Sequence, residues 1–450
     1  MLEAAFYGDD FTGSTDALLQ FERCGLRSVL LVELPPADEL RDLATRYDVI
    51  GVAGIARSLA PHEQEAEIRP ILIALRDLDP RIVQYKICST ADSSPRLGSI
   101  GRALEVGRSV FGPAVVPVLA AQPELGRYTV FSHHFAAEAG TIHRLDRQPT
   151  MANHPATPTT EADLRVHLAA QTALEIGALH LTSYADLPNH YPHPTADAVI
   201  LDALSETDLH LLGQTLIASS NGRPTFAIGS GGLSRALALN LAPTPPTPSA
   251  ATLPSAPLGP ATGPTQGLVV SGSQSARTRQ QIEYAVNAGW LSLELHDPTS
   301  VRRTAVAALR DGTPGVVVHT GERTTQPIHN RVNSLGKALA EVTRAVVEEA
   351  NVRRVLIAGG DTSGHIVRNF GVRTLELVTA TNDFGPGTAL CRLTSPHRPI
   401  NGLEVLLKGG QMGTPDLFET FRTQTSATAA AQTSAQPTEG IPRQPPANGR

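Results

Sequence analysis

Residues 4–19 read AAFYGDDFTGSTDALL, and this stretch decides the class of fold. A short apolar run breaks at Gly8 into two adjacent carboxylates, Asp9 and Asp10, and apolar residues resume after a loop rich in hydroxyl side chains. That order predicts a strand, a polar loop and a helix. Open α/β sheets bind ligands outside the carboxyl ends of their strands, because loop backbone and helix N-termini meet at that edge. The stretch therefore predicts an α/β fold with a polar ligand at this turn.

The rest of the N-terminal half alternates strand and helix signals. Short apolar runs typical of buried strands occur at residues 29–32, 49–52, 82–87, 115–119, 199–201 and 225–228. Helical patterns occur between them at residues 16–23, 63–75, 161–174 and 233–240. This alternation favours a mostly parallel sheet with helices on its faces.

A proline-rich segment then separates two parts of the chain. Residues 242–266 read APTPPTPSAATLPSAPLGPATGPTQ, a composition typical of a semi-extended linker. The alternation restarts beyond it, with strand signals at residues 267–270, 292–295, 316–318, 355–358 and 405–407 and helical patterns at 278–288 and 335–349. After residue 421 the chain is too poor in apolar residues to order itself. We therefore expect two α/β domains with mostly parallel sheets, over residues 1–241 and 267–421, joined by the Pro-rich linker 242–266 and followed by a disordered tail, 422–450.

Bulk properties exclude several classes of protein. The 450 residues carry a formal net charge of -6, whereas a nucleic-acid binder normally has a basic excess. Cys24, Cys88 and Cys391 show neither metal-ligand nor disulfide spacing, which favours a reducing compartment. The start lacks a basic leader region, and no apolar run is long enough to span a membrane. We expect a cytoplasmic protein without nucleic-acid or membrane partners; a homo-oligomer is compatible with the sequence.

Asp9 and Asp10 are the strongest candidates for chemistry. Neighbouring carboxylates at a strand end can bind polyol hydroxyls, hold a divalent cation, or accept a proton from an alcohol that attacks phosphorus. The structural alternative is that one of them caps the following helix. Thr12, Ser14 and other hydroxyls are also available as caps, which favours a functional role for the pair. Asp16 is interpreted as the more structural acid.

A second candidate site follows the strand signal at residues 82–87. Residues 86–101 read KICSTADSSPRLGSIG, in which hydroxyls, backbone N–H groups and Lys86 precede a helix and could bind an anion such as a carboxylate or phosphate. The alternative is a serine-rich surface loop. Arg57 also follows a strand signal, and it could form a forked pair with a carboxylate or an ordinary surface ion pair.

The region of residues 131–158 has few regular signals. It holds four histidines whose spacing matches no zinc site, so we interpret it as a polar lining or lid over a small substrate. These histidines are His133, His134, His143 and His154.

The second domain carries three glycine turns after strand signals. They are VVSGSQS at residues 269–275, GGDTSG at 359–364 and KGGQMG at 408–413. Glycine lets the backbone approach phosphate oxygens closely, so three such turns favour a nucleotide phosphate tail. Tight strand-to-helix turns are the alternative for each one. The chain lacks GxxxxGK[ST] and GxGxxG, which disfavours a Walker ATPase and a standard dinucleotide fold.

These motifs occur in a recognisable order. GDDFTGSTD, YKICSTADSSP followed by GSIG, MANHPATP, VVSGSQS, AGGDTSG and LLKGGQMG resemble the four-carbon acid sugar kinases over about residues 1–421. The resemblance implies an ATP-dependent kinase whose first domain holds a short sugar acid and whose second holds ATP with Mg²⁺. Substrates of this type include threonate, erythronate, 3-oxo-tetronates and 3-oxo-isoapionate, phosphorylated on a terminal hydroxyl. No residue of this chain is assigned as a Mg²⁺ ligand.

The resemblance also implies residue roles. Asp10 or Asp9 would orient and deprotonate the hydroxyl. The substrate would be bound by Arg57, Lys86, Ser89, Thr90, Asp92 and Ser93, with its carboxylate held by Arg57, Lys86 and the loop of residues 89–94. The nucleotide would be bound by Ser271, Ser273, Gly359, Gly360, Asp361, Thr362, Ser363 and Gly409. The family more often has glutamate at Asp361 and a serine and asparagine turn at Gly410 and Gln411, which weakens any side-chain assignment there. Two other functions stay open, a non-catalytic sensor of sugar acid and nucleotide, and a kinase acting on a larger sugar acid.

Overall fold

The computed structural model describes residues 2–154, 156–187, 196–220, 224–242, 266–321, 328–378 and 384–424. The linker predicted at residues 242–266 and the tail predicted at 422–450 lie almost wholly outside the described residues. Among the described helices, none has the length and apolar character that crossing a bilayer requires.

The N-terminal domain is built on a parallel sheet, as the alternating pattern predicted. Its strand order is β2-β3-β1-β4-β11-β5-β10-β9. The strands are β1 (Ala4–Gly8), β2 (Ser28–Leu31), β3 (Val49–Ala53), β4 (Ile82–Lys86), β5 (Val116–Leu119), β9 (Ile176–Leu179), β10 (Ala198–Leu201) and β11 (Thr225–Gly229). The helices are α1 (Phe11–Glu22), α2 (Ala37–Arg46), α3 (Pro61–Arg76), α4 (Ile100–Phe111), α6 (Leu164–Ala169), α8 (Glu206–Ala218) and α9 (Gly231–Leu241). β1 occupies the middle of this sheet, so its carboxyl end opens among neighbouring strand ends.

The C-terminal domain has a second, mixed arrangement of strands. β12 (Gly267–Ser271), β13 (Leu291–Glu294), β14 (Gly315–His319), β15 (Arg354–Ala358) and β18 (Glu404–Lys408) are parallel. β17 (Ala389–Thr394) runs antiparallel to both β18 and β16 (Thr374–Leu377). The helices are α10 (Ala276–Asn287), α11 (Pro298–Arg310), α12 (Ile328–Glu349), α13 (Gly360–Asn369) and α14 (Leu417–Thr423). α14 therefore continues two residues past the boundary that we drew at residue 421.

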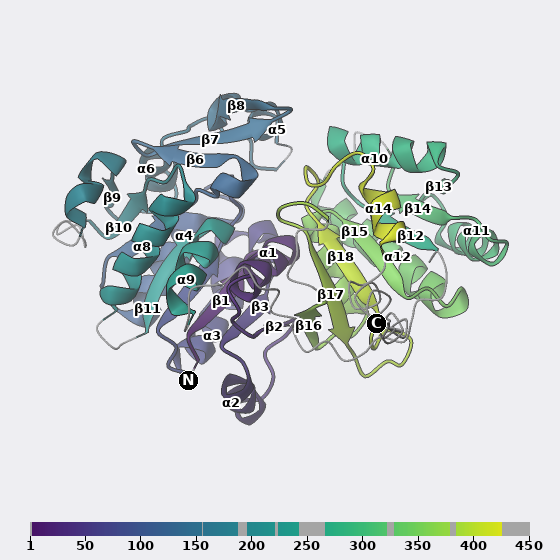
Figure 1. The fold of residues 1–450 in the computed structure, drawn as a ribbon, viewed down its shortest axis with the longest axis horizontal. Helices are drawn as coiled ribbons and strands as arrows, with labels where there is room; N and C mark the ends of the chain where they lie inside the picture. Colours follow the sequence, from purple (N-terminus) through teal and green to yellow (C-terminus); the bar gives the residue numbers. More distant parts are fainter. Residues whose placement is uncertain are drawn as a thin grey trace, which may run out of the picture.

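The sheets of the two domains join edge to edge. β16 pairs antiparallel with β2, with Thr374 opposite Leu31 and Leu375 opposite Leu30, so the strands of the two domains named above form one sheet of 15. Figure 1 shows this junction between the two lobes, where the purple β2 meets the yellow-green β16 and β17. The hydroxyl of Tyr47 donates a hydrogen bond across the same junction to Glu376 Oε1, 2.7 Å away. The domains are thus connected by backbone pairing as well as by the chain.

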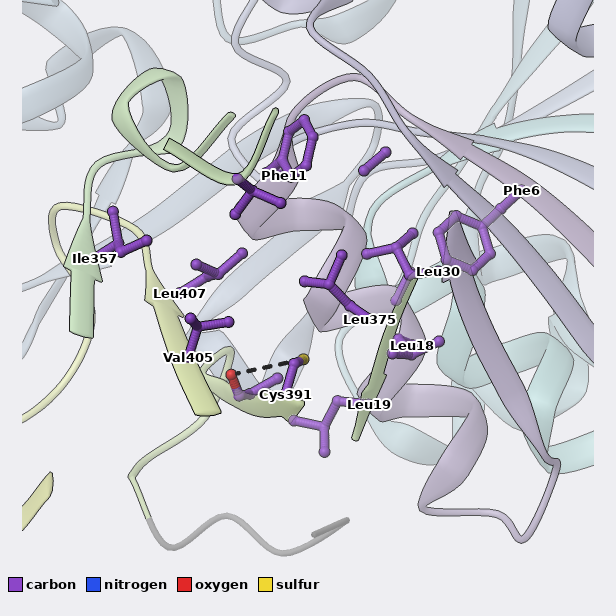
Figure 2. Packing of buried hydrophobic residues seen from close by; sticks show 14 of the residues in the cluster. Phe6, Phe11, Leu18, Leu19, Leu30, Ile357, Leu375, Cys391, Val405 and Leu407 are labelled. Carbon is purple, nitrogen blue, oxygen red and sulfur yellow. Dashed lines mark hydrogen bonds between the residues drawn. The ribbon is translucent and has the colours of Figure 1, made fainter. Parts of the chain in front are cut away.

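Helix α1 packs into the apolar core that the domains share. Nearly all of its residues are buried, a pattern typical of a helix enclosed on several sides. In Figure 2, Phe11, Leu18 and Leu19 of α1 gather with Phe6 and Leu30 of the first domain and with strand residues of the second. Those strand residues are Ile357, Leu375, Cys391, Val405 and Leu407. The turn between β1 and α1 is consequently anchored at the interface of the domains.

The histidine-rich region is more regular than its sequence predicts. β6 (Arg127–Val130), β7 (His133–Glu138) and β8 (Thr141–Arg144) form a separate antiparallel sheet above the first domain, followed by the short α5 (Pro149–Ala152). The helix predicted over residues 161–174 is wrong in its bounds, because α6 begins only after Asp163. That side chain caps the helix through the Arg165 N–H, while its backbone forms a β-bridge to His133.

Candidate active site

Asp10 is both a helix cap and a cavity residue. It is the N-cap of α1, where Oδ1 accepts a hydrogen bond from the Gly13 N–H at 2.8 Å and Oδ2 accepts one from Thr12 Oγ1 at 2.7 Å. The side chain is only 4% exposed, yet it lines a cavity at this edge of the sheet. The capping role that we set against a functional role is therefore present together with access to a ligand.

Arg57 connects the two adjacent carboxylates. It lies in the 3₁₀ turn η1 (Ala56–Ser58) after β3, and its Nη1 and Nη2 donate to Asp10 at 2.8 and 2.9 Å. Nη2 and Nε also donate to Asp9, at 2.6 and 3.2 Å. All three nitrogen atoms of the guanidinium are thus used by Asp9 and Asp10. This side chain orients the acidic pair and also lines the cavity, so its predicted contact with the substrate carboxylate stays a prediction.

The two carboxyl groups differ in pKa and in access to the cavity. Burial raises the pKa of Asp9 to about 6, with Asp10 adding repulsion and Arg57 opposing the rise. Burial also raises the pKa of Asp10, but Arg57, Lys86 and the hydrogen bonds from Thr12 and Gly13 outweigh that effect and hold it below the ordinary value. Asp9 is not among the residues that line the cavity. Asp10 is therefore the carboxylate of the pair that is both ionised at neutral pH and placed to meet a ligand.

Lys86 and Asp16 form a second charged pair on the cavity wall. Lys86, at the end of β4, is 2% exposed; its Nζ donates to Ile87 O at 2.9 Å and lies 3.9 Å from Asp16 Oδ2. Asp16 accepts hydrogen bonds from Gln20 at 3.1 Å and from Gln122, whose Nε2 is 3.1 Å from Oδ2. Both Lys86 and Asp16 line the cavity. Sequence reasoning gave Asp16 a structural role and missed that it faces a ligand site.

Some residues of the loop after β4 line the cavity, and others hold the loop in place. Ser89, Thr90 and Asp92 line the cavity, as predicted for substrate contacts. Ser93 is not a lining residue, and its hydroxyl donates to Ala91 O at 3.0 Å and contacts His167 Nε2 at 2.9 Å. The hydrogen bonds of Ser93 hold the loop in place, and its predicted contact with the substrate stays a prediction.

Two of the four histidines lie close to this loop: His134 supports its backbone, and His154 lines the cavity beside it. His134 is fully buried; its Nε2 donates to Ser89 O at 2.7 Å and burial lowers its pKa to about 4, so the ring is neutral and its Nδ1 accepts from Thr129. His154 lines the cavity with Thr157, whose hydroxyl bonds to both His154 Nδ1 and Asp92. His133 and His143 do not line it. The small antiparallel sheet thus contributes part of a polar wall.

The cavity has a volume of about 670 Å³ and is formed by both domains. The second domain contributes Gly360, His365, Gly387, Gly409, Gly410, Gln411 and Met412. A volume of this order suits a small polar ligand together with part of a second ligand.

The three glycine turns of the second domain lie against one another. A Cβ on Gly272 would lie 2.0 Å from Thr362 Oγ1, and one on Gly410 would lie 2.7 Å from Ser273 Oγ. Gly359 adopts a φ of 115°, a conformation that other residues rarely take. The turns thus form a single cradle, in which a side chain on Gly272 or Gly410 would meet a hydroxyl of a neighbouring turn.

Lys408 stabilises this cradle through buried hydrogen bonds. The side chain is fully buried, and its Nζ donates to Thr278 Oγ1 at 3.0 Å and to Gly410 O at 3.2 Å. Burial lowers its pKa to about 7, and Arg277 adds to the effect. Because Ser275 Oγ also donates to Gly410 O, at 2.5 Å, several donors fix the position of one turn carbonyl.

The predicted nucleotide residues separate into two groups. Gly360 and Gly409 line the cavity. The Ser363 hydroxyl donates to Gly359 O at 2.8 Å, and Ser271 Oγ accepts the Ser273 N–H at 3.2 Å, so these side chains stabilise the turns. Ser273, Gly359 and Thr362 lie within the cradle but are not lining residues. Asp361 lies in the first turn of α13, and its side chain lies outside what the structure describes.

The two halves of the site meet at Gly360. A Cβ on this residue, the first of α13, would lie 2.6 Å from Asp10 Oδ2 in the other domain. Gly364, one turn later, packs on Phe11 and Ile55 in the same way, with its Cβ position 3.1 Å from the Phe11 ring. The amino end of α13 is therefore directly beside the carboxylate of Asp10.

No group of three or more His, Cys, Asp and Glu side chains that could hold a metal ion exists among the residues described. Sequence reasoning also missed two lining residues, Gln122 and Arg127. They lie in the loop after β5, which has no cluster of charged residues or glycines. Their signal was positional: the loop after the strand predicted at residues 115–119 opens at the same sheet edge as the other motifs.

Comparisons with known proteins agree with this division into two lobes. The chain matches the family model of a sugar-binding N-terminal domain over residues 4–237 and that of a nucleotide-binding C-terminal domain over residues 268–418. It is 35% identical to the 3-oxo-isoapionate kinase of Paraburkholderia graminis, over 93% of each chain. It is 29% identical to the 3-oxo-tetronate kinase of Pseudomonas fluorescens, over 91% of this chain and 94% of that one.

Solved structures share the fold. A protein from Salmonella typhimurium LT2, provisionally assigned as a tRNA synthase, superposes with a TM-score of 0.69 over 93% of this chain and 98% of its own, at 21% identity. At that identity the likeness concerns the fold alone. The two family models span most of the chain, and the kinase relatives cover more than nine-tenths of it. The chain therefore belongs to the four-carbon acid sugar kinase family.

Proposed function

We propose that this protein is an ATP-dependent kinase that transfers the γ-phosphoryl group of ATP to a terminal hydroxyl of a short sugar acid. The observation that carries the proposal is the contact between Gly360 and Asp10, with a Cβ position only 2.6 Å from the carboxylate. It brings a helix N-terminus, which favours phosphate oxygens, next to a carboxylate that can bind an alcohol. The names of the kinase relatives support the same reaction class.

Asp10 is the residue that contacts the reacting hydroxyl. Its carboxylate is ionised because Arg57 and Lys86 outweigh the effect of burial on its pKa. An ionised carboxylate accepts a hydrogen bond from the alcohol and then its proton as the oxygen attacks phosphorus. Asp9 acts through Arg57 and is a positioning residue. Since the protein does little covalent work in phosphoryl transfer, this fixed alignment supplies much of the acceleration.

The glycine cradle fits a nucleotide phosphate tail. When bound, ATP with Mg²⁺ supplies the phosphoryl group and neutralises part of its charge. The backbone at Gly359, Gly360 and Gly409 is free of side chains that would keep phosphate oxygens away, and Lys408 holds the turn carbonyl of Gly410 back from them. We assign no protein ligand to Mg²⁺, which is usually held by phosphates, water and one or two carboxylates.

A kinase assay across a panel of acids tests the proposal. The panel contains 3-oxo-isoapionate, 3-oxo-tetronate, threonate, erythronate and a five-carbon aldonate, with ADP release and product mass as readouts. We expect ADP and a phosphorylated acid with at least one four-carbon or branched substrate, and none without acid. Turnover of the five-carbon acid alone would favour a kinase for larger acids. Binding of acid and ATP without any ADP release would instead identify a sensor.

A further inference from the structure

We propose that Arg127 binds the carboxylate of the acid substrate, through the Nε and Nη2 edge of its guanidinium. The proposal rests on the proposed function and names the group that distinguishes an acid from a neutral sugar. Sequence reasoning placed this role on Arg57 and Lys86. Among the described residues, the arginine and lysine side chains that line the cavity are Arg57, Lys86 and Arg127.

Two of these three cations already have carboxylate neighbours. Arg57 donates from all of its nitrogen atoms to Asp9 and Asp10. Lys86 Nζ lies 3.9 Å from Asp16 Oδ2. Arg127 has no ion pair with any residue in the described ranges, although it is only 5% exposed. A buried charge without a counter-ion in contact is costly, and Glu138 acts on Arg127 only from beyond ion-pair distance, so an anionic ligand would reduce that cost.

The hydrogen bonds of Arg127 leave one edge of its guanidinium available. Nη1 donates to Leu125 O at 2.8 Å, to Ala137 O at 3.0 Å and more distantly to Gly126 O at 3.5 Å. Nε is buried without a hydrogen-bond partner, and Nη2 donates to no residue of the described chain. Nε and Nη2 point the same way and together match the two oxygens of a carboxylate. Burial also lowers the pKa of Arg127 somewhat, yet an arginine stays charged.

The backbone around Arg127 holds this edge in place. Gly126 has a φ of 67°, and a Cβ there would lie 2.7 Å from the Cβ of Ala137 in the adjacent strand. The backbones of Gln122 and Arg127 form an antiparallel bridge, with N–H to O distances of 2.9 and 3.2 Å. A guanidinium that is held by carbonyls and a closed turn loses little entropy when it binds an anion.

Gln122 supplies a second unsatisfied group from the same bridge. Its Nε2 donates to Asp16, while its Oε1 is buried and has no partner among the described residues. Residues opposite one another in an antiparallel bridge place their side chains on the same face. A sugar acid carries hydroxyls next to its carboxylate, so it could donate to Gln122 Oε1 while its carboxylate pairs with Arg127.

Calorimetric binding of threonate, erythronate and the primary amide of threonate tests the proposal independently of turnover. We expect wild-type protein to bind the acids about 10- to 100-fold more tightly than the amide, the range typical of a charged hydrogen-bonded pair. Arg127→Gln should bring this ratio near one. Arg127→Lys keeps the charge without the fork and should restore only part of it. Arg23→Gln is the matched control, because it removes a cation paired with Glu124 in the same neighbourhood but outside the cavity.

The outcomes separate this proposal from the proposed function. Equal binding of acid and amide by the wild type, or no binding of either acid, would overturn the role of Arg127. So would an Arg127→Gln protein that melts like the wild type and keeps its preference for the acid. If Arg127→Gln does not fold, the acid-to-amide binding ratios of the wild type and of Arg127→Lys still test the proposal. A preserved binding ratio without any kinase turnover would instead contradict the kinase and leave the anion site standing.

Discussion

The two oxygens of the Asp10 carboxylate each accept a hydrogen bond from Arg57, at 2.8 and 2.9 Å. The two side chains come from different strand ends and are nearly buried, so the pair fixes the plane of the carboxylate that faces the cavity. A substitution that keeps the shape of Asp10 but removes its charge still leaves Arg57 paired, because Arg57 also donates to Asp9 at 2.6 and 3.2 Å.

Replacing Asp10 by asparagine should abolish most turnover and leave ATP binding intact. Asparagine still caps α1, because it is as good an N-cap as aspartate, but it cannot accept a proton. We expect kcat to fall by about 10²- to 10⁴-fold. Calorimetry with ATP and steady-state kinetics check the two halves of this expectation. Asp48→Asn is the control, since Asp48 also pairs with an arginine at two distances of 3.1 Å but on the surface. Unchanged kcat in Asp10→Asn would remove Asp10 from the reaction.

Adding one methyl group at Gly360 should separate the two halves of the site. Alanine is a good helix residue, but its Cβ would lie 2.6 Å from Asp10 Oδ2, so the carboxylate or α13 must move. A displacement of this size should lower kcat about 100-fold while the melting temperature changes little. Kinetics and thermal unfolding of Gly360→Ala measure both. Wild-type kcat in a protein that binds ATP normally would contradict the close approach that carries the proposed function.

Lys408 should matter for the nucleotide and not for the acid. Lys408→Met keeps the volume and removes the donor to Thr278 Oγ1 and Gly410 O, so the turn of residues 408–413 loses one anchor. We expect KM for ATP to rise about tenfold, the effect of one lost hydrogen bond from a charged or polar donor, with KM for the acid unchanged. Lys337→Met is the matched control, because Lys337 is exposed on α12. A rise in the KM of both variants, or of neither, would show that Lys408 does not support the cradle.

Glu22 should make the protein less stable as the pH rises from about 5 to 8. Burial raises the pKa of Glu22 from 4.5 to about 7, so the folded protein holds a proton that the unfolded chain releases. The native state therefore loses stability relative to the unfolded state as pH increases through this window, by up to about 3 kcal/mol. Glu22→Gln keeps an acceptor for the Ser28 N–H and should remove this slope.

Urea unfolding at pH 5 and pH 8 measures the slope in each variant. The difference in unfolding free energy between Glu22→Gln and wild type should grow with pH. Glu65→Gln serves as the control, because Glu65 lies in a partly exposed ion pair with Arg69 and its pKa is lowered, not raised. Parallel pH profiles for wild type and Glu22→Gln would contradict the assignment.

Local pattern predicted much of the fold because most strands of a parallel sheet are continuous apolar runs. The strand at residues 4–8 and its polar turn are an example, since burial on both faces requires an uninterrupted hydrophobic sequence. β7 was missed because it alternates buried and half-buried residues and contains two histidines. β16 was missed because its identity as a strand depends on pairing with β17 and, 343 positions away in register, with β2.

The positions of the candidate site residues could be predicted from the sequence, but the contacts between their side chains could not. The strand-end position of Asp10 is a local property of the sequence, whereas its pairing with Arg57 is a contact across 47 residues. The same limit applies to Arg57, whose hydrogen bonds to Asp9 and Asp10 could not be predicted from its own neighbourhood. It also explains why Arg127 was overlooked, since what distinguishes it is a missing counter-ion, and a missing partner leaves no mark in the neighbouring residues.

Because β2 pairs with β16, the two domains of this chain are expected to stay together even without a covalent connection. The two lobes share backbone hydrogen bonds and an apolar core around α1, independently of the connecting residues 243–265. Severing the peptide chain within that connection would leave those contacts in place, so the two fragments should remain associated as a noncovalent pair. Each fragment alone would present an unpaired strand edge, β2 or β16, which is a surface that proteins usually keep covered. The main effect of the covalent connection would then be that the two domains are always made in equal amounts.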